Sequence, residues 1–180
     1  MNIARIYYPV RTLGPGERVG IWTAGCPRRC AGCISPELLD IQNGRDLQIS
    51  EILDIIDFIP GNTKSFTISG GEPFFQAEEL SRLLCALLDI NDDIIAFTGY
   101  TLDDLRAMDN PFVDAALAKI TVLIDGRYMH ELNDGVGLRG SSNQQIHIFR
   151  NHEYYSRLEQ QPRSVQGVRY GDSFLNIGIP

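Results

Sequence analysis

The sequence has little positive charge and no long apolar stretch, and each shortage excludes a class of protein. Its 180 residues include 16 Lys and Arg against 23 Asp and Glu, which gives a formal net charge of −7 at pH 7. This acidic balance argues against a surface dedicated to nucleic acid or to an anionic membrane. No apolar run approaches the ~18 residues that a membrane-spanning helix needs, and no basic segment followed by an apolar stretch marks a signal peptide. We therefore expect no nucleic-acid partner and no membrane association.

Cysteines are also few, and their placement is not that of a disulfide framework. Of the four cysteines, three lie in one short segment as Cys26, Cys30 and Cys33, and Cys85 lies far from them. Clustered thiols of this kind favour a reducing compartment. We therefore expect a cytoplasmic location, and an exposed metal cluster would further favour low oxygen. Cys85 stands among leucines in a helix-like run, so we expect it to be buried and to act as a small apolar side chain.

The three clustered cysteines form a C-x3-C-x2-C pattern that indicates a metal centre. Three neighbouring thiolates are soft ligands suited to iron–sulfur clusters or to zinc. A structural zinc ion normally takes four protein ligands, and here the fourth would have to be a distant residue such as His130 or His147. A four-iron cluster held by three cysteines leaves one iron free to bind a small molecule. We favour this [4Fe-4S] interpretation.

Short apolar segments alternate along the chain with segments of helical periodicity. Ser50 is the expected cap of the first helix, and Pro60-Gly61-Asn62 its expected end. The alternation is typical of a parallel sheet covered by helices, an α/β fold, in a chain long enough for one domain. We expect strands over residues 19–24, 66–69, 94–98 and 120–124. We expect helices over residues 51–58, 77–88, 102–108 (capped by Thr101) and 112–118.

Both ends of the chain also carry strand patterns. Residues 1–9 predict a strand or a cover over the sheet, and residues 146–149 one more strand. Residues 165–170 and 173–177 flank Gly171-Asp172, which predicts a C-terminal β-hairpin. We expect a main domain over residues 1–150, with residues 151–180 as an extension packed on the same domain.

Polar groups and glycines follow the ends of the expected strands. Gly70 and Gly71 would let a ligand approach the backbone closely, and main-chain carbonyls there could accept hydrogen bonds from an ammonium group. Glu72 follows them, and a structural hydrogen-bonding role is open for it. Thr98 and Asp125 stand at two later strand ends. Asp125 could bind a cation, a ribose or an amine, or it could simply stabilise a turn before glycine.

Three arginines are further candidates. Arg139 and the Gly-Ser-Ser-Asn after it suit an anion or carboxylate contact, or a loop fixed by side-chain-to-backbone bonds. We favour a role for Arg139 beside the bound cofactor or facing a partner. Arg28 and Arg29 lie inside the cysteine segment, where we expect them to face solvent. Two cations there would attract an acidic electron-donor protein.

Several segments, in order, resemble the radical S-adenosylmethionine (SAM) enzymes. More narrowly, the chain is similar to the activating enzymes of anaerobic (class III) ribonucleotide reductase, from about Arg5 to His147. The segments that carry the resemblance are Gly14-Pro15-Gly16, the cysteine loop, Ser69-Gly70-Gly71-Glu72-Pro73, Thr98-Gly99-Tyr100, Leu123-Ile124-Asp125-Gly126 and Arg139-Gly140-Ser141-Ser142-Asn143-Gln144.

The resemblance implies a fold and a set of cofactor contacts. The fold would be a partial (β/α) barrel of the radical SAM type. The cofactors would be a [4Fe-4S] cluster on the three cysteines and SAM, whose methionyl amine and carboxylate would chelate the open iron. The Gly70-Gly71-Glu72 segment would bind the amino group, and the backbone around Gly32, Cys33 and Ile34 would contact the adenine. Ile34-Ser35 departs from the aromatic or histidine followed by asparagine that is usual in this subgroup.

The resemblance also implies the reaction. An electron would split SAM into methionine and a 5′-deoxyadenosyl radical, which would abstract a hydrogen atom from a glycine of a large reductase. Flavodoxin or a similar protein would supply the electron. The same chemistry on another glycyl radical enzyme, a ribosomal peptide or a small molecule stays open. So does a non-catalytic iron–sulfur or zinc protein, although a plain cluster carrier needs no amine-binding strand end.

Overall fold

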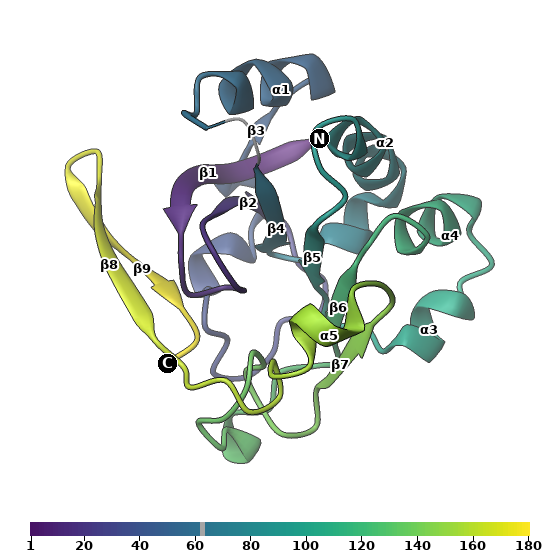
Figure 1. The fold of residues 1–180 in the computed structure, drawn as a ribbon, viewed down its shortest axis with the longest axis vertical. Helices are drawn as coiled ribbons and strands as arrows, with labels where there is room; N and C mark the ends of the chain where they lie inside the picture. The colour runs from purple at the N-terminus through teal and green to yellow at the C-terminus, as the bar shows by residue number, and fades with distance from the viewer. Residues whose placement is uncertain (62–63) are drawn as a thin grey trace.

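The computed structural model describes residues 1–61 and 64–180, with a seven-stranded sheet at the centre of the molecule (Figure 1). Asn62, expected at the end of the first helix, lies outside the described residues. The strand order is β3-β1-β2-β4-β5-β6-β7. Its four central strands run parallel, which confirms the α/β prediction: β2 (Arg18–Thr23), β4 (Ser65–Gly70), β5 (Ile94–Phe97) and β6 (Val122–Asp125).

The strands at both edges of the sheet run antiparallel to their neighbours. β1 (Asn2–Val10) pairs with β2, so residues 1–9 form a strand. β7 (Gln145–Ile148) pairs with β6 and confirms the strand expected near residues 146–149. β3 (Arg45–Asp46) is a two-residue strand beside β1 and was not predicted. A strand this short has no periodicity of its own, because it is defined only by the chain that it pairs with.

Each parallel strand is followed by helical structure. The longest helix, α2 (Ala77–Leu88), has the predicted bounds, and α3 (Leu102–Arg106) begins after its predicted cap. There the Thr101 hydroxyl accepts a hydrogen bond from the Asp104 amide at 3.0 Å. The remaining helices are α1 (Ile49–Asp57), α4 (Pro111–Leu117), the unpredicted α5 (His152–Tyr155), and four short 3₁₀ helices, η1 (Pro36–Leu38), η2 (Ile41–Asn43), η3 (Pro73–Gln76) and η4 (His130–Leu132).

The start of α1 corrects the predicted cap. The helix already begins at Ile49, so Ser50 lies in its first turn and does not precede it. Gln48 occupies the capping position, and its backbone amide donates to the Glu51 carboxylate at 2.7 Å. A side chain that reaches back in this way satisfies one of the free amides of a helix start.

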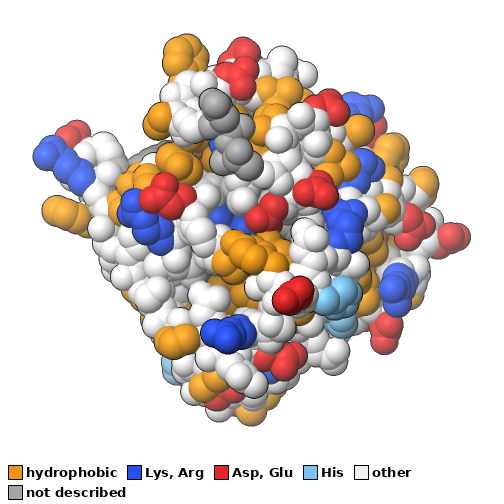
Figure 2. Space-filling view, in the orientation of Figure 1, with side chains coloured by type: hydrophobic (Ala, Val, Ile, Leu, Met, Phe, Trp, Pro, Cys, Tyr) orange, Lys and Arg blue, Asp and Glu red, His pale blue; other side chains and the backbone are white. Residues whose placement is uncertain are grey.

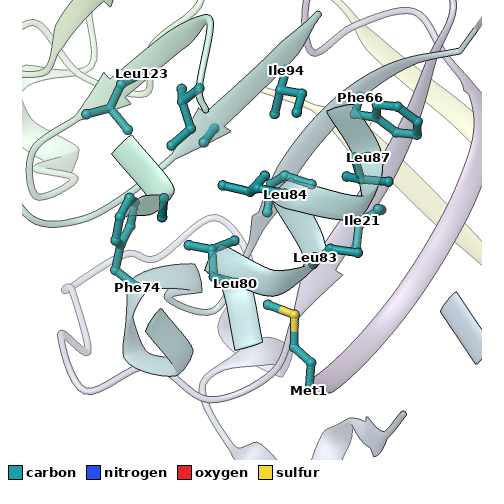
Figure 3. Packing of buried hydrophobic residues seen from close by; sticks show 14 of the residues in the cluster. Met1, Ile21, Phe66, Phe74, Leu80, Leu83, Leu84, Leu87, Ile94 and Leu123 are labelled. Carbon is teal, nitrogen blue, oxygen red and sulfur yellow. The ribbon is translucent and has the colours of Figure 1, made fainter. Parts of the chain in front are cut away.

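The two faces of the sheet are covered by different parts of the chain. One face packs against α1, α2 and α4, and Figure 3 shows this cluster, with Leu80, Leu83, Leu84 and Leu87 of α2 turned toward the sheet. The other face packs against residues from the last third of the chain, including Leu138, Tyr155, Leu158, Ile177 and Ile179. Alternate residues of a strand point to opposite faces, so both clusters draw on the same strands.

Cys85 is exposed, and the expectation that it is buried was wrong. It lies on α2, whose buried residues are Ser81 and the leucines at positions 80, 83, 84 and 87. Each helical residue is rotated by about 100° from the one before it, and this turns the thiol after Leu84 away from the sheet. Leucine neighbours in sequence do not ensure burial on an amphipathic helix.

The C-terminal hairpin is confirmed. β8 (Val165–Tyr170) and β9 (Ser173–Gly178) pair antiparallel and project beside β1 in Figure 1 (yellow). The Gln166 side chain fixes the hairpin to the main sheet: its amide donates to the Pro9 carbonyl at 2.9 Å and its oxygen accepts from the Arg11 amide at 3.1 Å.

Acidic and basic side chains are interspersed over the face of the molecule that Figure 2 shows. Among the described residues, no helix is both long enough and apolar enough to cross a membrane.

Candidate active site

A cavity of about 200 Å³ lies where the parallel strands end, and all three clustered cysteines line it. Its wall also includes the end of β4 at Gly70 and Gly71 and the residues that follow β5 and β6. The carboxyl ends of parallel strands meet at one edge of a sheet, where α/β proteins commonly bind ligands. The structure thus brings the cysteine loop and the strand ends to one place.

The cysteine loop leaves β2 and is fixed by main-chain hydrogen bonds. The Gly25 amide donates to the Leu38 carbonyl at 3.0 Å, and the Cys26 amide to the Leu39 carbonyl at 3.1 Å. The segment between is therefore a closed loop whose ends are held together. Cys26, Cys30 and Cys33 are each half-buried in it.

Backbone amides surround two of the thiols. Burial raises the pKa of the Cys26 thiol, while hydrogen bonds from the Arg28 and Arg29 amides act in the opposite direction. Burial likewise raises the pKa of the Cys33 thiol, and the Ser35 amide opposes this. N–H donors directed at cysteine sulfur are among the features that stabilise and tune iron–sulfur clusters. The donor set and its surroundings fit a cluster held by three thiolates.

Both histidines considered as zinc ligands have polar partners other than the cysteines. His147 Nε2 is 2.8 Å from the Asp125 carboxylate. His130 packs over Gly32, where an added Cβ would lie 3.1 Å from the His130 Cβ, and its Nδ1 is 3.2 Å from the Tyr128 hydroxyl. Among residues 1–61 and 64–180, no three His, Cys, Asp or Glu side chains are grouped around a single-ion position.

Gly70 and Gly71 lie where the end of β4 meets the end of β2 and the start of the cysteine loop. Gly70 has a φ of +121°, and a Cβ on it would lie 2.3 Å from the Thr23 amide nitrogen. A Cβ on Gly71 would lie 2.4 Å from the Gly25 carbonyl oxygen. The Gly71 amide donates to the Thr23 carbonyl at 2.8 Å. The two glycines therefore couple the end of β4 directly to the start of the cysteine loop.

Glu72 is completely buried and joins the end of β4 to the end of β5. One carboxylate oxygen accepts from the Thr98 hydroxyl at 2.8 Å and from the Phe74 amide at 3.1 Å, and the other accepts from the Gly99 amide at 2.7 Å. Burial raises the pKa of this carboxyl, opposed by these hydrogen bonds and by the charge of Arg28. Of the two roles considered for Glu72, the geometry favours the structural one.

Thr98 and Asp125 are placed differently with respect to the cavity. Thr98 lines it. Asp125 is buried and lies outside the lining, with one carboxylate oxygen accepting from the Leu102 amide at 2.6 Å and the other from the Gln145 amide at 3.2 Å. Asp125 thereby connects the end of β6 to the starts of α3 and β7, which favours a structural role.

Arg139 also lies outside the lining and holds a loop. Its guanidinium donates to the Asp134 carboxylate at 3.0 Å and to the Gln144 carbonyl at 3.5 Å. Gln144 lines the cavity, and the sequence analysis assigned it no role of its own. Its side chain accepts from the Gly140 amide and donates to the Gly126 carbonyl, both at 2.7 Å. Gln144 therefore sets the shape of this wall.

Arg28 corrects the expectation that both loop arginines face solvent. Arg29 is exposed, whereas Arg28 is half-buried and lines the cavity. The Arg28 guanidinium carbon lies 4.6 Å from the centre of the Tyr100 ring, a cation–π contact. Its Nε is buried and has no hydrogen-bond partner among the described residues. The site therefore contains a cation beside the cysteines that the sequence pattern alone did not place there.

The last residues of the chain also line the cavity. Asn176, Ile177 and Gly178 of β9, with Ile179 after it, lie in the same wall as the cluster cysteines. Strand periodicity predicted the hairpin, but it carries no signal for which distant surface the hairpin contacts. Only the three-dimensional packing brings this segment to the site.

Known proteins are similar to this chain over most of its length. Residues 12–147 match the family model of the 4Fe-4S single cluster domain. The anaerobic ribonucleoside-triphosphate reductase-activating protein of Salmonella typhimurium is 32% identical over 155 residues, covering 80% of this chain and 97% of that relative. The protein of the same name from Enterobacteria phage T4 is 28% identical over 151 residues, covering 81% and 93%. The pyruvate formate-lyase-activating enzyme of Staphylococcus aureus is 33% identical over 140 residues, covering 74% and 55%.

Proposed function

This chain belongs to the 4Fe-4S single cluster domain family and to the radical SAM activating proteins of anaerobic ribonucleotide reductase, and from that premise we propose that it places a radical on a glycine of such a reductase. The observation that carries the proposal is the meeting of the three-cysteine loop with the glycine-rich end of β4 in one cavity. Cysteines alone would suit many iron–sulfur proteins. Their combination with a strand end that can accept an ammonium group suits SAM.

The cofactors supply the chemistry and the protein supplies their placement. A [4Fe-4S] cluster held by Cys26, Cys30 and Cys33 would supply one electron for the cleavage of SAM to methionine and a 5′-deoxyadenosyl radical, and this radical would take a hydrogen atom from glycine to give 5′-deoxyadenosine. A glycine is a suitable donor because its radical is delocalised over both neighbouring amides. The electron must come from an external reductant.

Different residues of the chain would hold the cluster and bind SAM. Cys26, Cys30 and Cys33 would hold the cluster, and the main chain at Gly70 and Gly71 would accept hydrogen bonds from the methionyl amine. Support for the second assignment comes from the close approach of these glycines to the start of the cysteine loop. The backbone of residues 32–34 would contact the adenine, since all three positions lie in or beside the lined wall.

Polar residues around the cavity would position these groups. The Arg28 guanidinium is suited to the methionyl carboxylate, because it is a half-buried cation beside the cysteines with an unpaired Nε. Glu72 and Thr98 would fix the ends of β4 and β5. Asp125 and Arg139 would act from outside the cavity, by holding the loops that carry Gly126 and Gln144.

The proposed architecture is a partial (β/α) barrel of the radical SAM type. It is supported by the four parallel strands with helices over one face and the cavity at their carboxyl ends. Residues 1–150 would form the radical SAM domain, and residues 151–180 an extension packed on it. Burial of Tyr155, Leu158 and Ile177 against the second face of the sheet supports this division.

The proposed partners are a large glycyl radical reductase and an electron donor such as flavodoxin. Exposed Arg29, beside the cluster cysteines, would favour an acidic donor. The net charge of −7 supports the absence of a nucleic-acid partner. The unpaired clustered thiols support a reducing cytoplasm.

The proposal is tested with anaerobically reconstituted protein, SAM, a reductant and the anaerobic reductase of the same organism. We expect a glycyl radical doublet in the electron paramagnetic resonance (EPR) spectrum of the reductase and matching formation of 5′-deoxyadenosine. Pyruvate formate-lyase is the matched alternative substrate, because its activating enzyme is also similar to this chain. A doublet on the lyase alone would move the assignment to that partner, and SAM cleavage with a radical on neither would refute glycyl radical activation.

A further inference from the structure

The C-terminal strand β9 forms part of the wall of the SAM cavity, although it lies outside the family match. The match covers residues 12–147, whereas Asn176, Ile177, Gly178 and Ile179 line the cavity together with the cysteines. The shared family features therefore do not account for this wall. A wall at a radical site faces either the cofactor or the substrate that enters.

This wall is held firmly in place. The Thr12 hydroxyl donates to the Ile177 carbonyl at 2.9 Å, and the Arg163 guanidinium donates to the Pro180 carbonyl at 3.1 Å. Ile177 and Ile179 are buried in the second hydrophobic cluster. Contacts on both sides of Gly178 thus fix the backbone of the segment, so the residues next to it are presented in a defined position.

Asn176 lies on the face of the hairpin that does not pack against the main sheet. It pairs with Gly167, whereas Ile177 and its partner Gln166 point toward the body. A Cβ on Gly167 would lie 3.7 Å from the Asn176 side-chain oxygen. The residue is exposed and is one of those that line the cavity. Within residues 1–61 and 64–180, nothing is hydrogen-bonded to its carboxamide.

A carboxamide in this position suits a peptide substrate that has no side chain to hold. A glycine offers only the amide N–H and C=O groups on either side of its α-carbon. An asparagine side chain carries both a donor and an acceptor and can pair with one peptide group through both. We propose that Asn176 binds a peptide group beside the target glycine and is a specificity-determining residue for the glycine segment of the reductase. This inference rests on the proposed function.

The test compares three variants of the reconstituted full-length protein. Asn176→Ala removes the donor and the acceptor, and Asn176→Asp keeps only acceptors. Arg169→Ala is the control, because Arg169 is an exposed residue of the same hairpin whose guanidinium bonds only to the nearby Gly171 carbonyl among the described residues. For each, the KM for the reductase and the kcat of glycyl radical formation are measured by EPR. The 5′-deoxyadenosine formed without the reductase is measured in parallel.

We expect Asn176→Ala to raise the KM for the reductase by about tenfold, the effect of losing roughly one or two hydrogen bonds. Asn176→Asp should show a similar loss, because a carboxylate has no N–H for the peptide carbonyl. Cleavage of SAM without the reductase should stay at the wild-type rate in both variants, and Arg169→Ala should match the wild type throughout.

Binding gives a second readout that needs no turnover. Trp22 is the chain's one tryptophan and lines the cavity, so its fluorescence should report a peptide copied from the glycine segment of the reductase. We expect this peptide to bind about tenfold more weakly to Asn176→Ala. A wild-type KM and a wild-type peptide affinity in Asn176→Ala would overturn the inference, as would an equal loss of SAM cleavage without the reductase. A wild-type protein that cleaves SAM but activates no reductase would instead refute the proposed function.

Discussion

Each end of the parallel sheet contains a carboxylate, partly buried at Asp93 and completely buried at Glu72, and their surroundings shift the two pKa values in opposite directions. Asp93, just before β5, receives the Arg18 guanidinium at 2.7 Å and a short hydrogen bond from the Tyr155 hydroxyl. Glu72, after β4, receives hydrogen bonds from the Thr98 hydroxyl and from backbone amides. Burial raises the pKa of both groups, but the Arg18 contact reverses the balance at Asp93, whose pKa is lowered, while that of Glu72 is raised.

The different partners of Asp93 and Glu72 distinguish the two ends of the sheet: the amino ends of the strands are closed, and the carboxyl ends are open. At the amino ends of the strands, Arg18 is completely buried and also donates to the Thr67 hydroxyl and the Phe66 carbonyl, which ties three strands together. At the carboxyl ends, hydrogen bonds from neutral groups to Glu72 and the close approach of Gly70 and Gly71 join the strands. A cavity remains beside the cysteines. An ion pair stabilises one end, and the other end keeps room and ligand atoms for cofactors.

The largest expected effect is on activity and comes from the open end. Replacement Cys30→Ala should remove the cluster, because two thiolates cannot hold it, and should abolish formation of 5′-deoxyadenosine. The free energy of unfolding of the cluster-free protein should change little, because Cys30 is only half-buried in a loop. Iron content, SAM cleavage and urea unfolding measure the three quantities. Cys85→Ala is the matched control, since that thiol is exposed on α2 and should leave all three unchanged.

The next effect is on stability and comes from the closed end. Replacement Arg18→Met should lower the free energy of unfolding by about 3–5 kcal/mol, because it leaves a carboxylate partly buried without its partner. In the wild type, the lowered pKa of Asp93 contributes stability above about pH 3.9 that is lost as the pH falls through the folded pKa. Urea unfolding at pH 7 and at lower pH measures both effects. Equal stability of variant and wild type at pH 7 would contradict the closed-end description.

Replacement Glu72→Gln tests the other carboxylate. One of its oxygens would become an NH₂ group facing N–H or O–H donors, which should cost about 1–3 kcal/mol of unfolding free energy. The pH dependence should have the opposite sign from that of Asp93. Because the pKa of Glu72 is raised, its contribution is full below about pH 4.3 and declines as the pH rises through the folded pKa. The difference in unfolding free energy between the wild type and Glu72→Gln should therefore shrink as the pH rises. A difference that grows with pH would contradict this.

The smallest predicted effect is that of Tyr155→Phe. The variant loses one hydrogen bond to Asp93 and keeps the buried ring, so we expect a loss of about 1 kcal/mol. Cleavage of SAM per folded molecule should be unchanged, because Tyr155 lies at the end of the sheet away from the cysteines. Thermal unfolding measures the loss of stability, and the 5′-deoxyadenosine assay measures SAM cleavage separately. A large loss of cleavage with intact folding would show that the two ends are coupled.

The elements that could be predicted from the sequence are those with a local pattern. The leucine spacing of α2 defines both of its ends, and the Thr101 cap marks the start of α3. The three cysteines and the Gly70-Gly71 strand end also stand out as short motifs. Each of these signals depends on residues within a few positions of one another.

What could not be predicted depends on contacts between distant positions. Glu72 and Thr98 are 26 residues apart, and no pattern links them before the fold brings β4 and β5 together. Arg28 was expected in solvent from its place in the cysteine loop, and its contact with the Tyr100 ring, far along the chain, has no signal in the sequence. The same holds for Asn176, which reaches the cavity only through the packing of the hairpin on the second face of the sheet.

The central claim is that three thiolates leave one cluster iron open to SAM. The most direct measurement is electron–nuclear double resonance of the anaerobically reduced protein with SAM labelled at its methionyl nitrogen or carboxylate. The account predicts about four irons per chain and a coupling between the label and the cluster that Cys30→Ala abolishes. A cluster with a fourth protein ligand and no coupling to the label, or zinc bound in its place, would contradict it.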